Sequence, residues 1–502
     1  MVNHRSGALA FVLMAKSSSP SVSLDGHSLS IADVVAVARS HAPVSLDPKA
    51  LDAVRKSRQA VEAAIARGQT IYGVNTGFGK LAHVRIPGDQ ARQLQLNLIR
   101  SHASGVGEPL PTDAVRAMML LRANVLMRGT SGVRPVLPEL LIDMLNRKLH
   151  PTVPSQGSVG ASGDLAPLSH LALAMIGEGD VKPPQPITLE AKEGLAFVNG
   201  TQAQTGLAAL LVSDAWTLWH AAHAAAAMSL EAVRGSPDPF DARIHDARPH
   251  PWQQRSAALL RELLADSEIR ESHRENDPRV QDAYSLRCTP QVLGAVGEGL
   301  AFAERLTATE LNAATDNPLV FGDEVMSGGN FHGQPIALAL DVIGIVLTTL
   351  AGLSERRLER VVNPDLSSGL PAFLAHDPGL ESGFMTAQIA AAALVADCRV
   401  LATPASVQSV PTEGNQEDIV PMGMTAAWKA GRILANAERI VAIELLAGAQ
   451  GLEYLKPLRP AKAIARVHAA VREDSAALTG DRPLTADIEK LAVRVREGRF
   501  GS

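Results

Sequence analysis

Long segments rich in alanine and leucine dominate the second half of the chain and constrain its fold more than any other feature. They cover residues 205–233, 292–314, 334–361 and 422–449. Each is much longer than the mean α-helix of about 11 residues. Aromatic residues make up only 3% of a chain that is 46% hydrophobic, so small and branched aliphatic side chains must fill the core. This pattern predicts long helices packed side by side rather than an α/β sheet.

The first part of the chain alternates shorter helical patterns with glycine-rich turns. Apolar residues recur at helical spacing over 51–66, 89–102 and 113–127. Four glycines between residues 68 and 79 interrupt this spacing and predict a loop, a kind of segment that often carries function. Residues 151–167 hold three prolines and several glycines, so we expect neither regular helix nor strand there.

Three regions follow from these patterns. We interpret 1–20 as a disordered extension, 21–200 as an N-terminal region and 201–502 as a long helical bundle. The apolar run between Arg5 and Lys16 faintly resembles a signal peptide, but no clean cleavage site of small residues follows it. We therefore expect a cytoplasmic protein.

Charge and cysteine content disfavour several classes of partner. The net charge is −5, and no basic stripe with interleaved aromatic residues suggests nucleic-acid binding. No run reaches the ~20 uninterrupted apolar residues of a membrane span. Cys288 and Cys398 are isolated, and no histidine or carboxylate group has metal-ligand spacing. We expect no nucleic acid, membrane or metal as partner.

The segment Gly157–Leu165, with the sequence Gly-Ser-Val-Gly-Ala-Ser-Gly-Asp-Leu, carries the most chemical information. Ser162 lacks the Gly-x-Ser-x-Gly spacing of a nucleophile elbow, because residue 164 is Asp. Backbone cyclisation is a second possibility. The unhindered amide of Gly163 can attack the carbonyl of Ala161, and loss of water then leaves an alkene at residue 162. A glycine-rich turn before a helix is the alternative, and this segment alone does not decide between them.

Residues Gly157–Pro167 resemble the signature of the histidine/phenylalanine ammonia-lyases. Other stretches resemble this family in the same order, and together they cover about residues 40 to 460. These stretches are Tyr72–Gly79, Lys192–Gln202, Gln281–Cys288, Asp316–Val320, Ser327–His332 and Asn415–Asp418. The resemblance implies a mainly α fold, namely a long-helix bundle of the fumarase/aspartase-like type with a smaller loop-rich N-terminal region.

The family's reaction explains why an electrophile is needed. Removing ammonia from an α-amino acid requires loss of a non-acidic β-hydrogen and departure of a poor leaving group, so acid–base catalysis alone is insufficient. The resemblance implies that Ala161-Ser162-Gly163 forms 4-methylideneimidazol-5-one, to which the substrate amine adds. A base then removes the β-proton, and an α,β-unsaturated acid departs. This electrophile takes the place of a metal.

The resemblance also implies roles for individual side chains. Tyr72 matches the family's base and lies in a glycine-rich loop that can close over the substrate. Arg287 matches the arginine that binds the substrate carboxylate, for which its planar fork suits a bidentate grip. The other matched positions are Asn199, Tyr284, Phe331 and Glu417 for catalysis, and Gln281 and Asn317 for substrate binding. Asn199 and Tyr284 are expected near the prosthetic group.

Several positions bear on the choice of substrate. Ser101 and His102 match the Ser-His pair of histidine ammonia-lyases, where phenylalanine lyases tend to have Phe-Leu and tyrosine lyases His-Leu. Met385 and Glu417 also resemble the histidine enzymes. A carboxylate at Glu417 can accept a hydrogen bond from an imidazole N–H. The resemblance therefore favours elimination of ammonia from L-histidine to give urocanate.

Other positions depart from the histidine lyases. Glu413 stands where they usually have Ser, and a second carboxylate so close to Glu417 alters the charge of the pocket. Gln334 replaces a usual Glu, Ala283 replaces a usual Pro, and the connection over 179–192 is shorter than in the usual bacterial enzymes. A lyase for a modified histidine or for phenylalanine or tyrosine stays open, as does a 2,3-aminomutase with the same electrophile. A non-catalytic structural relative is a further alternative.

The expected assembly is a homotetramer. A bundle this rich in alanine and leucine needs partners that bury its outer faces. The resemblance implies active sites shared among three subunits, so that Tyr72 serves an electrophile in another chain.

Overall fold

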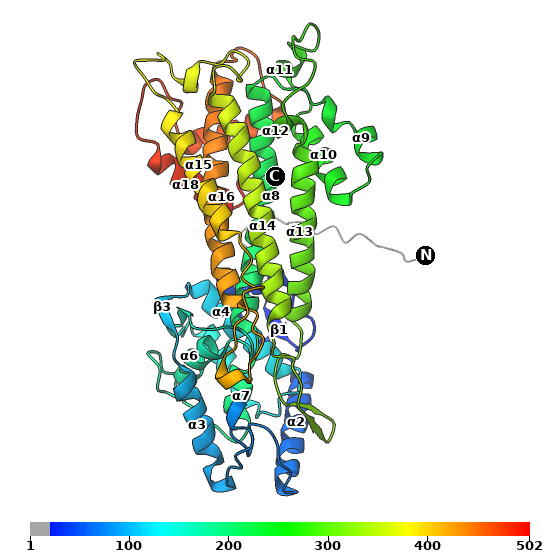
Figure 1. Ribbon diagram of the computed structural model, residues 1–502, viewed down its shortest axis with the longest axis vertical. Coiled ribbons are helices and arrows are strands. Elements are labelled where there is room, and N and C mark those ends of the chain that lie inside the picture. Colours follow the sequence, from blue (N-terminus) through cyan, green and yellow to red (C-terminus); the bar gives the residue numbers. More distant parts are fainter. Residues whose placement is uncertain (1–20, 502) are drawn as a thin grey trace.

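Long helices run along the whole upper part of the molecule, and shorter helices and loops form its lower end (Figure 1). The computed structural model describes residues 21–501. The long helices are α8 (Gln202–Ala232), α13 (Thr289–Glu310), α14 (Gln334–Val362), α15 (Met385–Leu401) and α16 (Gly423–Glu453). This confirms the predicted mainly α bundle. The predicted extension and leader-like pattern over 1–20 lie outside the described residues, and the division near residue 200 stays a prediction.

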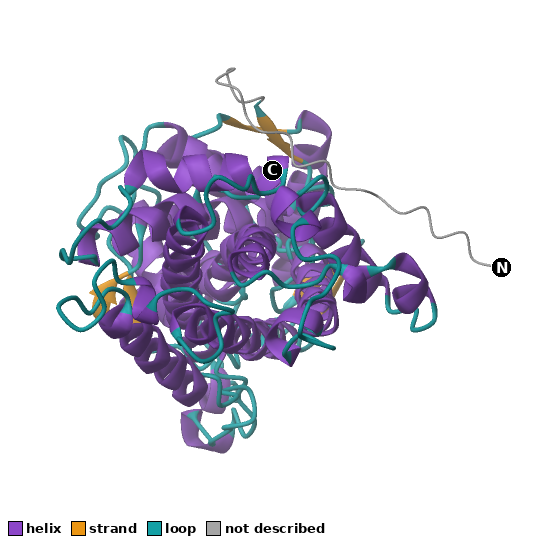
Figure 2. Cartoon of the chain, turned by 90° about the horizontal axis from the view of Figure 1, so that it is seen from above, coloured by secondary structure: helices purple, strands orange, loops and turns teal. Residues whose placement is uncertain are grey.

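Helix α8 forms the centre of the bundle, where the other helices surround it (Figure 2). Almost every residue of α8 is buried, which is expected for a helix that is apolar all round. Small residues let α16 approach α8 closely, since a Cβ at Gly451 would lie 2.9 Å from the Ala232 Cβ. A polar group adds specificity inside this apolar contact. The buried Glu444 carboxylate of α16 accepts hydrogen bonds from Ser229 on α8 (2.9 Å) and from Arg357 on α14 (2.5 Å).

Helix α14 alone among the helices of residues 21–501 is long and apolar enough to cross a membrane. About 56% of its most apolar window is buried inside the protein. It packs against α16, α13 and α8, as the core helix of a bundle does.

The smaller region at the lower end is built around α4 (Thr112–Met127), which is buried along nearly its whole length and packs against α8. Helix α2 (Pro48–Ala66) begins with an Asp47 cap and a proline in its first turn, a favourable start for a helix. The other helices of this region are α1 (Ile31–Ser40), α3 (Ala91–His102), α5 (Val136–Asn146), α6 (Leu165–Met175) and α7 (Glu193–Val198).

Short elements complete the fold. At the upper end and flank of the bundle are α9 (Ala242–Asp246), α10 (Pro251–Leu263), α11 (Glu268–Glu271), α12 (Tyr284–Arg287), α17 (Lys462–Asp474) and α18 (Thr485–Arg496). Within residues 21–501 the strands form three pairs. They are parallel β1 (Val22–Leu24) with β2 (Val44–Leu46), antiparallel β3 (Val106–Pro109) with β4 (Pro154–Gln156), and antiparallel β5 (Leu319–Phe321) with β6 (Glu324–Met326).

One expectation for the loops was wrong in detail. The segment 151–167 contains a strand, β4, because β3 supplies a partner from a distant part of the chain. It also contains the first residues of α6.

Candidate active site

The loop 157–164 lies where three long helices begin. Backbone N–H groups at or just before the first turns of α8, α14 and α16 donate to this loop. The bonds join Gln204 N to Asp164 Oδ2 (2.9 Å), Gly333 N to the Gly160 carbonyl (3.0 Å) and Met422 N to the Val159 carbonyl (2.8 Å). Helix N-termini carry partial positive charge and unpaired N–H groups. The segment that the sequence singled out therefore lies in a region of positive potential.

The middle of this loop leaves no room for a side chain at Gly163. This residue has φ +79°, and a Cβ there would lie 2.3 Å from the Gly200 carbonyl oxygen. The Asn199 side chain donates from Nδ2 to the Ser162 carbonyl (2.7 Å), while its buried Oδ1 has no hydrogen-bond partner among the described residues. Ala161 is buried as well. Close backbone approach, a small preceding side chain and a donor on the middle carbonyl fit a compact ring formed from the three residues.

Asp164 directly follows the tripeptide and is fully buried. Its carboxylate accepts hydrogen bonds from the backbone and side chain of Gln204 and from the Ser158 hydroxyl (3.3 Å). Burial away from water outweighs these bonds and raises the pKa of Asp164 to about 7. No role for Asp164 was predicted from the sequence, although the residue stands inside the motif.

A cavity of about 390 Å³ opens beside the tripeptide. Many of the residues predicted from the sequence line it together, although they lie far apart along the chain. They are Tyr72, Ala161, Ser162, Asn199, Asn317, Phe331, Glu413 and Glu417. An adjoining cavity of about 300 Å³ is lined by Ala161, Ser162, Gly163, Glu417, Ser101 and His102. The two cavities share Ala161, Ser162 and Glu417, so they are parts of one site. Tyr72 thus lies beside the tripeptide of its own chain, and the expectation that it serves an electrophile in another chain was wrong.

Tyr72 lies in the glycine-rich loop before the 3-10 helix η1 (Gly79–Leu81). Its hydroxyl oxygen accepts a hydrogen bond from Gly79 N (3.0 Å), and its ring packs edge-on against Phe78. Burial, and then the negative charges of Glu413 and Glu417, raise the pKa of Tyr72 above its ordinary value. The Gly79 N–H acts in the opposite direction, because it stabilises the phenolate.

Glu413 begins the 3-10 helix η5 (Glu413–Asn415) and packs directly on the tyrosine loop. A Cβ at Gly79 would lie 1.5 Å from Glu413 Oε1, so a side chain at residue 79 would displace this carboxylate. Burial and the charge of Glu417 raise the pKa of Glu413. Glu417 in turn accepts a hydrogen bond at Oε2 from the Thr412 hydroxyl (2.6 Å). The site thus holds two neighbouring carboxyl groups.

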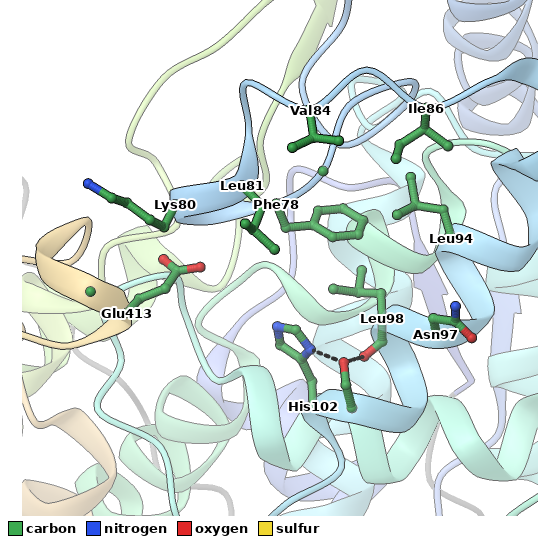
Figure 3. Close-up of a pocket in the computed structure, with 13 residues that line it drawn as sticks. Phe78, Lys80, Leu81, Val84, Ile86, Leu94, Asn97, Leu98, His102 and Glu413 are labelled. Carbon is green, nitrogen blue, oxygen red and sulfur yellow. Dashed lines mark hydrogen bonds between the residues drawn. The ribbon is translucent and has the colours of Figure 1, made fainter.

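His102 ends α3 and faces Glu413 from the other side of an apolar chamber of about 540 Å³ (Figure 3). The Ser101 hydroxyl donates to the Leu98 carbonyl (3.1 Å), so it accepts from His102 Nδ1–H (2.9 Å). This pattern leaves His102 Nε2 as a free acceptor. Burial lowers the pKa of His102, which keeps the ring neutral at neutral pH.

A buried ion pair stabilises the loop that carries Asn317. Lys192 at the start of α7 pairs with Asp316 at 3.0 Å, and both side chains are fully buried. Asp316 precedes Asn317, whose Oδ1 accepts from Gly328 N (2.8 Å). Such a pair stabilises only as a unit, because removal of one partner leaves an uncompensated buried charge. The pair therefore fixes the loop that carries Asn317 against α7.

Four predicted residues lie far from the tripeptide in the same chain. Gln281, Tyr284, Arg287 and Met385 belong to the upper end, around α12 and the start of α15. The tripeptide lies at the other end, beside α6 (Figure 1). Helix α13, which starts just after Arg287 and runs down the bundle, is about 33 Å long at 1.5 Å per residue. The Tyr284 side chain is 71% exposed, with the Arg287 guanidinium stacked over its ring at 4.6 Å.

Several residues that line the main cavity were not singled out from the sequence. They are Ala82, Ser327, Gly328, His332, Gln416, Asp418 and Ile419. Most of them stood inside the matched motifs, which was the available signal. His332 Nδ1 accepts from Gln334 N (3.4 Å), so its Nε2–H donates to the Ile419 carbonyl (3.2 Å) and joins two walls of the cavity. Within residues 21–501, no cluster of three histidine, cysteine or carboxylate side chains is suited to hold a metal ion.

Comparison with known proteins places the chain in a family. Residues 29–473 match the model of the aromatic amino acid lyases. The histidine ammonia-lyase of Myxococcus xanthus is 51% identical over 500 residues, which is 96% of this chain and 98% of that protein. The solved tyrosine aminomutase of Streptomyces globisporus has a TM-score of 0.91 and 41% identity, covering 96% of this chain and 97% of that one. The histidine ammonia-lyase structure from Trypanosoma cruzi has a TM-score of 0.88 and 42% identity, covering 95% of this chain and 94% of that one. The chain therefore belongs to the aromatic amino acid lyase family and is a carbon–nitrogen lyase.

Proposed function

We propose that this lyase removes ammonia from L-histidine to give urocanate, using 4-methylideneimidazol-5-one formed from Ala161-Ser162-Gly163. One observation carries the proposal. The imidazole-selective pair Ser101-His102 and the Glu417 carboxyl line the same cavity as the tripeptide. The nearly full-length similarity to histidine ammonia-lyases supports the same substrate.

Formation of the prosthetic group uses groups that are already close together. The Gly163 amide nitrogen adds to the Ala161 carbonyl carbon with loss of one water, and the Ser162 hydroxyl leaves with its α-hydrogen as a second water. The absence of a Cβ at Gly163 permits the close approach to Gly200, while the Asn199 amide holds the middle carbonyl. The resulting group supplies an electrophilic methylidene carbon.

The chain's own residues handle the proton. Tyr72 as phenolate accepts the β-proton of the substrate, and the Gly79 N–H stabilises the phenolate before the proton is transferred. The high pKa of Tyr72 makes it a strong base once it is ionised. The Asn199 Oδ1, buried without a partner among the described residues, is an acceptor for a substrate N–H.

Recognition of the ring depends on acceptors. His102 and the carboxyl groups of Glu413 and Glu417 line the space beside the tripeptide, so the N–H of an imidazole ring has acceptors within that space. A phenyl ring leaves them without partners, and buried polar groups that lose their partners cost binding energy. Glu413, which replaces a usual serine, also leaves a modified histidine as an alternative substrate.

We infer that the working enzyme is a homotetramer with composite sites. In one chain the tripeptide and the predicted carboxylate-binding Arg287 lie at opposite ends, so a neighbouring protomer must supply the arginine. Helix α15 supports this arrangement. It buries one face through Ala387, Ala391 and Val395, yet its other face leaves Ile389 57% and Val400 77% exposed. A second copy of the bundle matches such an aliphatic face. A cytoplasmic location agrees with free cysteines at both positions.

A 2,3-aminomutase is the second candidate, because an aminomutase structure is 41% identical over nearly the whole chain. Such an enzyme returns the ammonia to the β-carbon, so its product is a β-amino acid instead of an unsaturated acid.

Product analysis tests the proposal. L-histidine, L-phenylalanine and L-tyrosine are incubated separately with the enzyme, and products are identified by absorbance and NMR. Urocanate and free ammonia from histidine are expected, with discrimination of ~10⁴ against phenylalanine. His102→Leu should lower histidine turnover and raise relative turnover of phenylalanine, since an apolar side chain removes the unsatisfied acceptor. A preference of the wild type for tyrosine or phenylalanine, or a β-amino acid product, would overturn the proposal.

A further inference from the structure

The segment that leads into α12 has little regular structure of its own. Residues 272–283 form turns and bends between α11 and α12, and α12 is a single turn in which Leu286 is the buried residue. The exposed Tyr284 and the stacked Arg287 protrude from this turn. Contacts with other parts of the chain must therefore fix the position of this segment if Arg287 is to bind a carboxylate with bidentate geometry.

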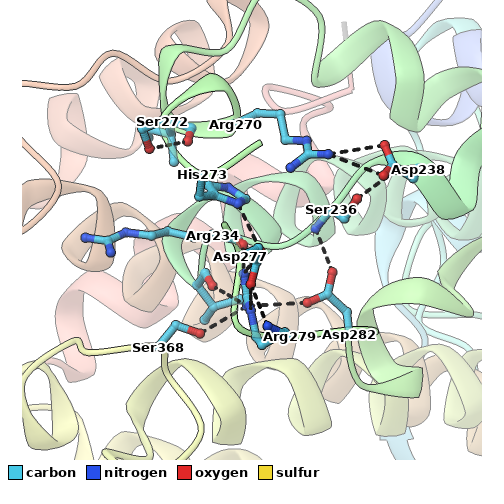
Figure 4. A network of polar contacts seen from close by, with 12 residues as sticks. Arg234, Ser236, Asp238, Arg270, Ser272, His273, Asp277, Arg279, Asp282 and Ser368 are labelled. Atoms are coloured by element: carbon cyan, nitrogen blue, oxygen red, sulfur yellow. Dashed lines mark hydrogen bonds and ion pairs between the residues drawn. The ribbon is translucent and has the colours of Figure 1, made fainter. Parts of the chain in front are cut away.

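Arg279 occupies the centre of a polar network around this segment (Figure 4). Its guanidinium group reaches the end of α8, the segment itself and the loop after α14. The contacts are Nη1 to the Val233 carbonyl (3.0 Å), Nη1 to Ser368 Oγ (3.1 Å), Nη2 to the Arg234 carbonyl, Nε to Asp277 Oδ1 (3.1 Å), Nη2 to Asp277 Oδ2 (3.0 Å) and Nη1 to Asp282 Oδ1 (3.4 Å).

The end of α8 is a favourable place for this cation. Val233 and Arg234 follow the last residue of α8, and the carbonyls of a helix C-terminus lack partners within the helix. A positive side chain satisfies these carbonyls and opposes the negative end of the helix dipole. Arg279 thus ties the segment to the end of α8, the central helix of the bundle.

The carboxylates of Asp277 and Asp282 connect Arg279 to the segment before α12. Asp277 grips the guanidinium of Arg279 with both oxygens and accepts from the Arg279 backbone N–H (2.9 Å). The hydrogen bond from Arg279 lowers the pKa of Asp277, which therefore stays charged. Asp282, two residues before Tyr284, accepts from Ser236 N at 2.6 Å beyond the end of α8. Both ends of residues 277–282 are therefore held to α8 through one arginine.

We propose that Arg279 is a positioning residue that holds Tyr284 and Arg287 in the orientation in which they meet the substrate of a neighbouring protomer. This inference rests on the proposed composite site. It predicts that loss of Arg279 harms binding of the substrate carboxylate specifically. A residue that only stabilises the fold would weaken all ligands together.

Inhibition constants for two ligands separate these outcomes. Imidazole propionate keeps the ring and the carboxylate of histidine, whereas histamine keeps the ring and lacks the carboxylate. Arg279→Met should raise the inhibition constant of imidazole propionate about tenfold or more, as loss of a charge-assisted contact does, and leave that of histamine within about twofold. Arg287→Met should give the same pattern, and the double variant should be no worse than Arg287→Met alone.

Matched variants complete the design. Arg270→Met removes a neighbouring arginine that pairs with Asp238 at 3.3 Å without contacting residues 277–287, so both constants should stay as in the wild type. Arg279→Lys keeps the positive charge but loses the planar guanidinium fork. It should raise the inhibition constant of imidazole propionate by less than Arg279→Met does and leave that of histamine unchanged. This variant provides the test if Arg279→Met does not fold. The inference would be overturned if Arg279→Met changed both inhibition constants equally or changed neither. Effects of Arg279→Met and Arg287→Met that add in the double variant would also overturn it. A wild type that binds neither ligand would instead contradict the proposed function.

Discussion

At the scale of single residues, the site is dominated by acids and bases whose burial changes their proton affinity. Tyr72, Glu413 and Asp164 have raised pKa values, and burial is the leading cause for each. The pKa of His102 is lowered instead, because burial favours the neutral form and the neutral form of histidine is the deprotonated one. Burial thus lowers the charge in a site that must hold two carboxyl groups and a tyrosine close together.

The charge of Glu413 should control the pH dependence of catalysis through Tyr72. The phenolate is the active form of the base, so kcat/KM should rise with pH into the alkaline range. Glu413→Gln removes a negative charge that opposes ionisation of Tyr72, so the rising limb should move to lower pH. The pH profile of kcat/KM measures this shift. Glu108→Gln, the same change on the exposed strand β3, should leave the limb in place; an unmoved limb in Glu413→Gln would show that Glu413 does not act on the base.

At the scale of secondary structure, the tripeptide loop depends on elements far apart in the sequence. The starts of α8, α14 and α16 all bond to it. Gly163 approaches the backbone of Gly200 so closely that no Cβ fits between them. The geometry that fits a compact ring therefore comes from tertiary packing, and the loop sequence supplies only small residues that permit it.

Gly163→Ala should block formation of the ring. The added Cβ would lie 2.3 Å from the Gly200 carbonyl oxygen, so the loop must move away from the position in which the amide attacks. Intact-mass spectrometry should show wild type lighter than its encoded mass by two waters and Gly163→Ala at its full mass. Gly68→Ala has a similar positive φ of +76° with open space around it, so it should lose about 1 kcal/mol of stability and still cyclise. Full loss of two waters in Gly163→Ala would contradict this view of the loop.

The sequence predicted the elements that have a clear periodicity. Helices α2, α3, α4, α8, α13, α14 and α16 begin and end within a few residues of the expected bounds. Helix α15 was not predicted, because alanine occupies so many of its positions that no apolar face stands out. Strands β4 and β5 were not predicted either, since three residues give no alternation to recognise and the partner of β4 is distant in sequence.

The candidate site was predictable to different degrees. Motif matching identified Tyr72, Asn199 and Glu417, and the structure brings them to one cavity. The hydrogen bonds that orient them, such as Gly79 N to the Tyr72 hydroxyl, depend on side-chain packing that a sequence pattern does not encode. The role of Arg279 was likewise invisible, because its partners lie in three separate segments.

At the scale of the whole molecule, the length of the bundle separates two groups that the proposed mechanism brings together, the tripeptide and Arg287. The tripeptide lies at the lower end and α12 at the upper end (Figure 1). Helices as long as α8 and α16 are stiff rods, so no bending within a chain joins these ends. Antiparallel packing of a second bundle through the exposed face of α15 provides a simple solution.

Complementation between two inactive variants tests this composite site most directly. Ser162→Ala removes the hydroxyl needed for the electrophile, and Arg287→Met removes the group expected to bind the carboxylate; each variant alone should turn over L-histidine orders of magnitude more slowly than the wild type. When the two chains are produced together and purified as mixed tetramers, some sites combine an intact tripeptide with an intact arginine, so a clear fraction of the wild-type activity should return. Mixed tetramers as inactive as the single variants, or wild-type monomers with full activity in sedimentation experiments, would contradict the account.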